Sequence, residues 1–282
     1  MSTPTPSSTP RPDEPFVLDP HSDAFYTRLG ADVFGPTLHV QGAWRDDEQH
    51  MAPVSGILAH AIDLHEPREE MQLARISYDI LGMIPARPST VEVRTTRPGK
   101  TIELVEATLS VDGRAVVRAD AWRLARHDST PVAGVELDPM PGPDDFPEWQ
   151  GTDVWAGGYI ADLEFRADPE RRPGRARVWL RSKRALVDGE ECSPVADLVR
   201  LVDTANGIAV RVSPREWMFP NVDLTIHLFR EPVPSRQGWV GFDTRVTMGP
   251  TGLGLTSTTL HDVEGPVGRA EQLLTVREMP GR

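Results

Sequence analysis

The hydrophobic positions of the chain fall into two similar series, each with one apolar helix and a set of alternating strands. In the first series, residues 53–64 (PVSGILAHAIDL) are mostly apolar and begin with Pro, which is favoured in the first turn of a helix. Residues 91–109 (VEVRTTRPGKTIELVEATL) alternate apolar and polar side chains, as half-solvated antiparallel strands do. Asp112 and Gly113 predict a hairpin turn. The strands predicted in this half cover residues 33–44, 72–80, 90–97, 101–111 and 114–123.

The second series repeats this order. Residues 193–206 (SPVADLVRLVDTAN) predict an apolar helix, and strands are predicted near 161, 176–184, 221–230, 238–247, 252–262 and 267–277. Two short matches support a duplication, because Pro53-Val54 corresponds to Pro194-Val195 and the run RADA (118–121) to RAEQ (269–272). Each series therefore predicts a long antiparallel meander wrapped around one buried helix.

Two segments without this periodicity divide the chain. Residues 1–15 (MSTPTPSSTPRPDEP) are rich in Pro, Ser and Thr and are expected to be a disordered tail. Residues 127–150 contain five prolines and several acids, which predicts a linker. We therefore expect an N-terminal unit at 16–126 and a C-terminal unit at 151–282.

Charge and composition exclude several classes of protein. The chain of 282 residues has a formal net charge of −12 and a pI near 5.1, so a general nucleic-acid role is disfavoured. The single cysteine, Cys192, cannot form an intramolecular disulfide, and no cysteine or histidine cluster indicates zinc. No apolar run is long enough for a membrane span, and the N-terminus lacks the plan of a secretory signal. A cytoplasmic protein is expected.

Three polar side chains are candidates for chemistry. Asp203 lies near the C-terminus of the second predicted helix, where the helix dipole disfavours a carboxylate. Asn221 opens a predicted strand, and Gln272 lies on the last one. Alone, they leave open a partly exposed acid, a turn residue and an ordinary strand glutamine. Together, an acid and two amides can hold and deprotonate one water.

The aligned positions of the first half lack this combination. When the two halves are aligned, Ile62 corresponds to Asp203, with Asp63 one residue too late, and Ala121 corresponds to Gln272. The sequence therefore predicts one site rather than two.

The strings LVDTANG (201–207), NVDLTIHLFREP (221–232) and GRAEQLLTVR (268–277), in this order, resemble the acyl-CoA thioesterase II-like double-hotdog family. The first half resembles it mainly through PVSGILAHAI (53–62). The resemblance implies an α+β fold, a tandem (double) hotdog with two antiparallel sheets, each wrapped around a central helix. It also implies an acyl-CoA thioesterase of fatty acid metabolism that needs no metal or redox cofactor.

The resemblance also assigns roles to residues. Asp203 falls at the family's catalytic aspartate and Gln272 at its catalytic glutamine, whereas Asn221 stands where the family often has Thr or Ser. Ser55-Gly56 stands at the start of the first helix where the family has a Gly-Gly pair, so Gly56 either donates its N–H to the oxyanion or packs tightly against the sheet. The acyl chain is expected to contact three consecutive residues, Trp217, Met218 and Phe219.

The partner implied is an acyl-CoA substrate, and self-association is left open. Residues 166–184 carry eight Lys and Arg against two acids. The Arg-rich part, 171–184, is interpreted either as a solvated strand face or as a site for the phosphates of coenzyme A.

Three other functions are alternatives for this sequence. A serine hydrolase would use Ser55 with His50 or His60, but no GxSxG motif surrounds Ser55. A hotdog enoyl-CoA hydratase needs an Asp/His pair, and no histidine follows Asp203 at a short spacing. A non-catalytic acyl-CoA-binding protein would have no use for the acid and its amides.

Overall fold

The computed structural model describes residues 16–233 and 237–280, so the predicted tail at 1–15 lies outside the described residues. The first half contains one long helix, α1, and the strands that surround it. Their bounds are β1 (Ala24–Arg28), β2 (Val33–Pro36), the 3-10 turn η1 (Leu38–Val40), α1 (Met51–Leu64), β3 (Met71–Ile80), β4 (Ser89–Arg97), β5 (Ile102–Val111) and β6 (Arg114–Ala125).

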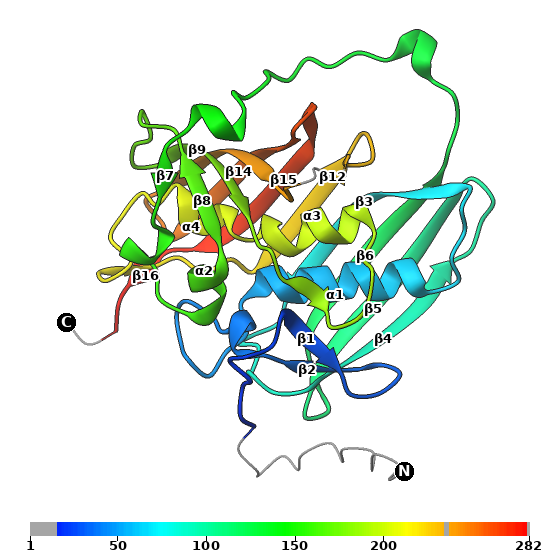
Figure 1. Cartoon of the computed structure of the whole chain (residues 1–282), viewed down its shortest axis with the longest axis horizontal. Coiled ribbons are helices and arrows are strands. Elements are labelled where there is room, and N and C mark those ends of the chain that lie inside the picture. The colour runs from blue at the N-terminus through cyan, green and yellow to red at the C-terminus, as the bar shows by residue number, and fades with distance from the viewer. Residues whose placement is uncertain (1–15, 234–236, 281–282) are drawn as a thin grey trace.

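The second half has the same plan with more short elements before its central helix, α3. Their bounds are η2 (Thr130–Val132), η3 (Pro143–Asp145), β7 (Glu148–Trp149), η4 (Gly151–Asp153), α2 (Gly158–Asp162), β8 (Glu164–Ala167), β9 (Arg175–Arg181), β10 (Ala185–Val187), α3 (Pro194–Val202), α4 (Ala205–Ile208), β11 (Trp217–Met218), β12 (Asp223–Leu228), β13 (Val240–Met248), β14 (Leu253–Asp262), β15 (Gly265–Thr275) and β16 (Arg277–Glu278). The segment between β6 and β7 crosses from one half to the other (Figure 1).

The two predicted sheets are one. In the described residues, 14 strands join in the order β10-β1-β2-β4-β5-β6-β3-β12-β15-β14-β13-β9-β8-β7. The order is mirrored about the central pair, β3 and β12, which is the duplication that the sequence predicted. These two strands are antiparallel neighbours, with Ile76 opposite Ile226, so their hydrogen bonds fuse the halves into a single sheet. The expectation of two separate sheets was therefore wrong.

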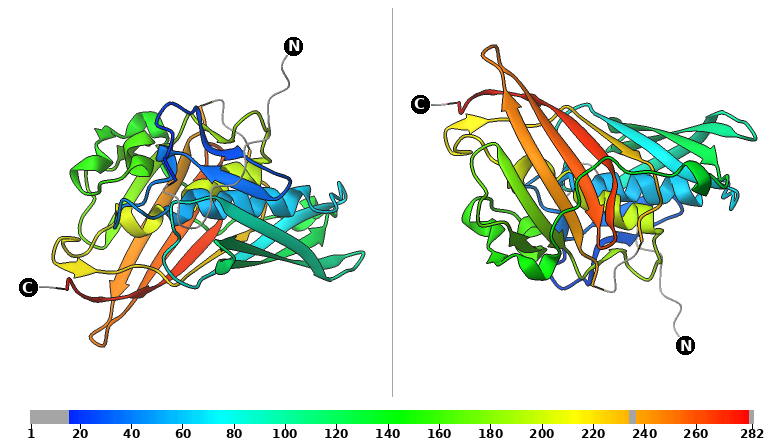
Figure 2. Two further views of the ribbon diagram at one scale, coloured as in Figure 1. Left: turned by 90° about the horizontal axis from the view of Figure 1, so that it is seen from below. Right: turned by 90° about the horizontal axis from the view of Figure 1, so that it is seen from above.

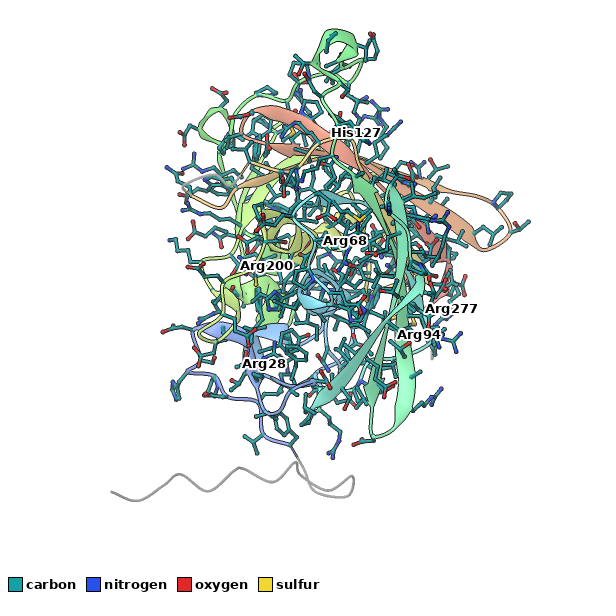
Figure 3. The ribbon with its side chains drawn as sticks, turned by 90° about the vertical axis from the view of Figure 1, so that its right-hand side faces the viewer. Arg28, Arg68, Arg94, His127, Arg200 and Arg277 are labelled. Carbon is teal, nitrogen blue, oxygen red and sulfur yellow. The ribbon has the colours of Figure 1, made fainter. Side chains whose placement is uncertain are left out.

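The sheet curves around the two central helices, which lie side by side against its inner face (Figures 1 and 2). The core between helices and sheet is apolar and includes Ile57 and Leu58 of α1 and Leu198 of α3. Viewed from the side, Arg200 of α3 lies inside this layer, whereas Arg94 of β4 lies on the outer face of the sheet (Figure 3).

The two helices run antiparallel and touch closely at Gly56 of α1. A Cβ atom added to Gly56 would lie 2.4 Å from the Cβ of Arg200, so only glycine allows this approach. Beside this contact, the hydroxyl of Ser55 donates to the backbone carbonyl of Val199 at 3.1 Å. The close crossing sets the N-terminus of each helix beside the C-terminus of the other.

Three local predictions need correction. The first helix begins at Met51 rather than at Pro53. Pro53 is its third residue, a position where Pro is also tolerated. The predicted helix at 193–206 is divided into α3 and α4 around Asp203. The predicted strand at 33–44 ends at Pro36 and continues into η1.

No helix within residues 16–233 and 237–280 has both the length and the apolar composition needed to cross a bilayer.

Candidate active site

Asp203 is the residue around which the site is built. It caps the C-terminus of α3 and is only 6% exposed, although it is an acid. The amphipathic sequence of α3 buries the face that ends in this carboxylate, so the charge is carried into the interior rather than into solvent. A buried carboxylate needs hydrogen-bond donors to offset the loss of water.

Two amides supply these donors, and both bind the same oxygen. The Nδ2 of Asn221, just before β12, donates to Oδ1 of Asp203 at 2.7 Å. The Nε2 of Gln272 on β15 donates to Oδ1 at 2.9 Å. The structure thus brings together the acid and both amides that the sequence singled out.

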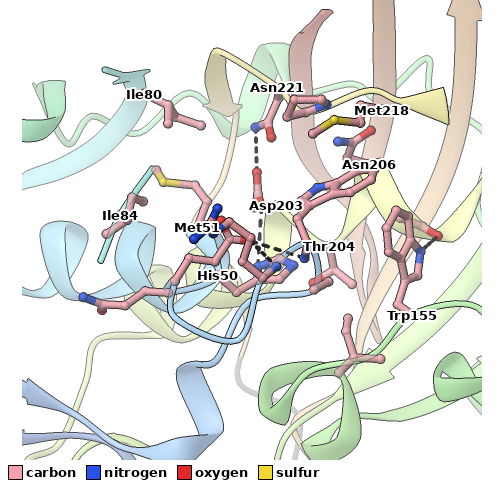
Figure 4. Close-up of a pocket in the computed structure, with 18 of the residues that line it drawn as sticks. His50, Met51, Ile80, Ile84, Trp155, Asp203, Thr204, Asn206, Met218 and Asn221 are labelled. Atoms are coloured by element: carbon pink, nitrogen blue, oxygen red, sulfur yellow. Dashed lines mark hydrogen bonds and ion pairs between the residues drawn. The ribbon is translucent and has the colours of Figure 1, made fainter. Parts of the chain in front are cut away.

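The second oxygen, Oδ2, faces the N-terminus of α1. It lies 3.6 Å from Nδ1 of His50, the N-cap residue of that helix. That Nδ1 atom accepts a hydrogen bond from the backbone N–H of Ala52 at 3.1 Å, so the ring proton belongs on Nε2. In Figure 4, Asn221 and His50 approach the carboxylate from opposite sides.

The protonation states follow from burial. Burial lowers the pKa of His50 to about 3, so this imidazole is neutral and does not form an ion pair with Asp203 despite the short distance. Burial also raises the pKa of Asp203 to about 6, an effect partly offset by the hydrogen bonds from Asn221 and Gln272. At neutral pH Asp203 is a mostly ionised base with a raised proton affinity.

A cavity of about 600 Å³ opens from these groups. Its polar end includes His50, Asp203 and Asn221. The remaining wall is largely aromatic and aliphatic, with Trp44, Trp149, Trp155, Phe165, Ile80, Ile84, Ile160, Ile208, Met51, Met83, Met218 and Met279. An apolar cavity with a few convergent polar groups is typical of a small-molecule site.

Only one of the three residues expected to contact an acyl chain lines the cavity. Met218 lines the cavity, whereas Trp217 and Phe219 are not among its lining residues. Phe219 is buried behind the wall, with its ring 5.4 Å from that of Trp44 and 5.8 Å from that of Trp155.

Gly56 is not positioned as the sequence suggested. Because α1 begins at Met51, Gly56 lies inside the helix, where its N–H belongs to the helical hydrogen-bond ladder. It packs against Arg200 and is not a lining residue of the cavity. The first turn of α1 at Met51 lies at the cavity instead, and amides of a first turn have no acceptor within their helix.

Sequence reasoning considered His50 only as a base for Ser55 and missed its place beside Asp203 and the side chains that hold it. The Tyr159 ring is centred 4.3 Å from the imidazole, and its hydroxyl shares a hydrogen bond with Thr204 at 2.7 Å. The sequence signal for the start of α1 was Pro53. Because Pro fits any position of a first turn, Pro53 did not identify His50 as the residue that precedes the helix.

The matching place in the other half is filled differently. At the C-terminus of α1, the guanidinium of Arg123 donates to the carbonyls of Ile62 and His65 and pairs with Glu103. Arg123, not Ala121, is therefore the β6 residue that reaches its helix end as Gln272 reaches α3. Asp63 accepts a hydrogen bond from Ser193 at 2.5 Å and does not line the cavity.

Among the residues that the structure describes, no three His, Cys, Asp or Glu side chains converge to hold a metal ion.

Comparisons with known proteins agree with this geometry. Residues 40–124 match the model of the acyl-CoA thioesterase N-terminal domain, and residues 135–276 match that of the acyl-CoA thioesterase C-terminal domain. No curated protein sequence matches the chain.

Several solved structures share the fold. A protein with a hot dog fold from Alicyclobacillus acidocaldarius aligns with a TM-score of 0.71 at 16% identity, over 92% of this chain and 98% of that one. An acyl-CoA thioesterase II from Mycobacterium marinum aligns with a TM-score of 0.62 at 14% identity, over 92% and 97% of the two chains.

The fold and site therefore define a hotdog protein with a buried carboxylate at an apolar cavity. The chain belongs to the acyl-CoA thioesterase family and is a thioester hydrolase.

The raised pKa of Asp203 predicts how stability depends on pH. Between its unfolded pKa of 3.8 and its folded pKa of about 6, the folded protein binds more protons than the unfolded chain. The free energy of unfolding therefore falls as pH rises through this range, by roughly 3 kcal/mol at most. The variant Asp203→Asn has no charge to bury, so we expect it to be more stable than the parent at pH 7.

Urea unfolding of both proteins at pH 7 and near pH 4 measures this difference. We expect the advantage of the variant, about 2 kcal/mol at pH 7, to shrink near pH 4, where the parent is also protonated. If the parent were more stable than the variant at pH 7, burial of ionised Asp203 would not cost the folded protein any stability.

Proposed function

We propose that the protein hydrolyses an acyl-CoA thioester to the free acid and coenzyme A, with Asp203 taking a proton from the attacking water. The observation that carries this proposal is that the two oxygens of one carboxylate have different surroundings. Oδ1 of Asp203 is held by two amides, while Oδ2 is turned toward the N-terminus of α1. A base needs one such oriented oxygen whose lone pair is not consumed by protein donors.

The two amides orient the base. Because both bind Oδ1, they fix the plane of the carboxylate and favour its ionised form, and burial increases its affinity for a proton. Asn221, in the place where the family often has a hydroxyl residue, fills this role through its Nδ2 and also donates to the carbonyl of Asp223 at 3.0 Å.

The first turn of α1 supplies the electrophilic side. Met51, the first residue of α1, lines the same cavity as Asp203, and its N–H together with the positive end of the helix dipole would stabilise the negative charge that a thioester oxygen gains. Neutral His50 keeps the turn in place by accepting from the N–H of Ala52. This assignment replaces Gly56 with Met51 as the proposed oxyanion donor.

The reaction balances without a cofactor. The water oxygen forms a bond to the thioester carbon while its proton passes to Oδ2 of Asp203, and the carbonyl oxygen becomes an oxyanion at the start of α1. Collapse of this intermediate breaks the C–S bond and expels the thiolate of coenzyme A. The proton on Asp203 then leaves to the thiolate or to solvent, which restores the base.

The acyl group would lie in the apolar part of the cavity, against Met218 and Trp155, with Phe219 supporting the wall from behind. We further infer that each helix-on-sheet half is one hotdog unit and that the two are fused in tandem. We also propose that this activity serves fatty acid metabolism in the cytoplasm.

One observation favours a second candidate function. The structure brings His50 within 3.6 Å of Asp203, the acid and histidine pair that a hotdog enoyl-CoA hydratase would use, although the two are far apart in sequence. Hydration is disfavoured because the Nδ1 lone pair of His50 is used by the N–H of Ala52 and Nε2 carries the ring proton, which leaves no free lone pair for a base.

A panel of acyl-CoA thioesters separates the candidates. Release of free thiol from saturated acyl-CoA substrates supports hydrolysis. Loss of the conjugated double bond of a 2-enoyl-CoA without thiol release would indicate a hydratase. Binding without either product would indicate a non-catalytic acyl-CoA-binding protein.

Replacing the base should stop turnover without unfolding the protein. We expect Asp203→Asn to lower kcat by about a hundredfold or more, the usual contribution of a positioned general base. Asp63→Asn is the matched control, because Asp63 lies at the end of the other helix and away from the cavity. Thiol release measures both variants, and equal losses would show that the active half is misassigned.

The rate should follow the ionisation of Asp203. Because only the ionised form accepts a proton, we expect kcat/KM to rise with pH up to about 6 and to level off above it. In Gln272→Ala, one donor that favours the ionised form is lost, so the midpoint should move to higher pH. Profiles of parent and variant with one acyl-CoA test this, and a midpoint that moves down would exclude Asp203 as the titrating group.

A further inference from the structure

The turn between β8 and β9 concentrates unpaired positive charge in an otherwise acidic protein. Most cations of residues 166–184 are neutralised, because five of them each pair with an acid: Arg166, Arg177, Arg181, Lys183 and Arg184. The exceptions are Arg171 and Arg172 in the turn and Arg175 at the start of β9. Arg171, Arg172 and Arg175 are exposed and form no ion pair within the described part of the chain.

These side chains surround a hollow rather than a flat surface. A depression of about 340 Å³ is lined by Asp168, Glu170, Arg171, Arg172, Arg175, Ala176 and Arg177. Its acid Asp168 is already held by Arg177, whose Nε donates to it at 2.7 Å. Glu170 is therefore left against three free guanidinium groups, and the hollow is positive.

A fourth arginine reaches the same turn from another element. Gly174 adopts φ +80°, and a Cβ added to it would lie 2.6 Å from a terminal nitrogen of Arg211. The N–H of Gly174 donates to the carbonyl of Ala209, which fixes the segment carrying Arg211 against the turn. The positive charges are thus held by backbone contacts between two segments.

The hollow adjoins the catalytic cavity through one side chain. The guanidinium of Arg171 lies 4.7 Å from the centre of the Trp149 ring, and Trp149 lines the cavity. Phe165, another lining residue, packs against Trp149 and precedes Asp168 by three residues, about 10 Å along an extended chain. Ile208 lines the cavity three residues before Arg211.

We propose that Arg171, Arg172, Arg175 and Arg211 form a phosphate subsite that binds the pyrophosphate and 3′-phosphate of coenzyme A beside the acyl cavity. This inference rests on the proposed function and adds the residues that recognise the nucleotide end of the substrate. Guanidinium groups pair with phosphate oxygens through two parallel hydrogen bonds. A chain of net charge −12 repels a polyanion, so a local positive site is needed to admit one.

The number of arginines favours coenzyme A over a carrier protein. A phosphopantetheine arm on a carrier protein offers a single phosphodiester, whereas coenzyme A offers several phosphate groups close together, which matches the four clustered guanidiniums.

The test compares substrates that share an acyl group. We expect the triple variant Arg171→Gln, Arg172→Gln and Arg175→Gln to raise KM for an acyl-CoA about tenfold with kcat unchanged. It should not affect hydrolysis of the same acyl group on pantetheine, which carries no phosphate. A matched triple variant of exposed arginines elsewhere, Arg114→Gln, Arg118→Gln and Arg269→Gln, should behave as the parent with both substrates.

Unchanged KM for acyl-CoA would overturn the subsite, as would an equal loss with acyl-pantetheine. A loss confined to an acyl carrier protein substrate would show that the arginines bind that protein instead.

A binding measurement separates this inference from the proposed activity. Calorimetry with adenosine 3′,5′-bisphosphate should show binding to the parent, to the control triple variant and to Asp203→Asn. The signal should be lost in the Arg171, Arg172 and Arg175 variant and should weaken with added salt. Binding by the parent without any thiol release would retain the subsite and reject the hydrolase. No binding by the parent would reject the subsite whatever the turnover.

Discussion

The close antiparallel crossing of α1 and α3 is the constraint on which the site depends. Gly56 allows the backbone of α1 to approach Arg200 of α3, and the crossing sets His50, at the start of α1, against Asp203, at the end of α3. A carboxylate at a helix C-terminus is disfavoured by its own helix dipole. Here the positive end of the other helix lies beside it and offsets part of that cost.

The same crossing creates two equivalent places, and the side chains at each decide which one can be a site. Each helix C-terminus lies beside the N-terminus of its partner, so the fold offers two equivalent places. At α3 the place holds a carboxylate and two amides facing a cavity. At the end of α1 the guanidinium of Arg123 binds the terminal carbonyls and pairs with buried Glu103 instead.

The parts that the sequence predicted well are those carried by local pattern. Helical and strand periodicity located both central helices and most strands. The isolated acid at an apolar helix end indicated Asp203, and its amides Asn221 and Gln272 do lie at hydrogen-bond distance from it.

The parts that it predicted poorly depend on contacts between segments. Pro53 is compatible with several positions in a first turn, so the helix start was placed two residues too late and Gly56 was expected closer to the start of α1 than it lies. His50 reaches Asp203 only through the helix crossing, which no spacing reveals. The fusion into one sheet arises from pairing of β3 with β12, whose edges carry no sequence signature of their partner.

We propose that Asp203 activates water rather than attacking the thioester itself. The direct test is a single turnover, with enzyme in excess over acyl-CoA, in water labelled with the heavy oxygen isotope, followed by mass spectrometry of the fatty acid and of the peptide that contains Asp203. The account predicts that the label enters the released acid and that the Asp203 peptide stays unlabelled. Label in the carboxylate of Asp203 would reveal an acyl-enzyme anhydride and contradict the role of Asp203 as a general base.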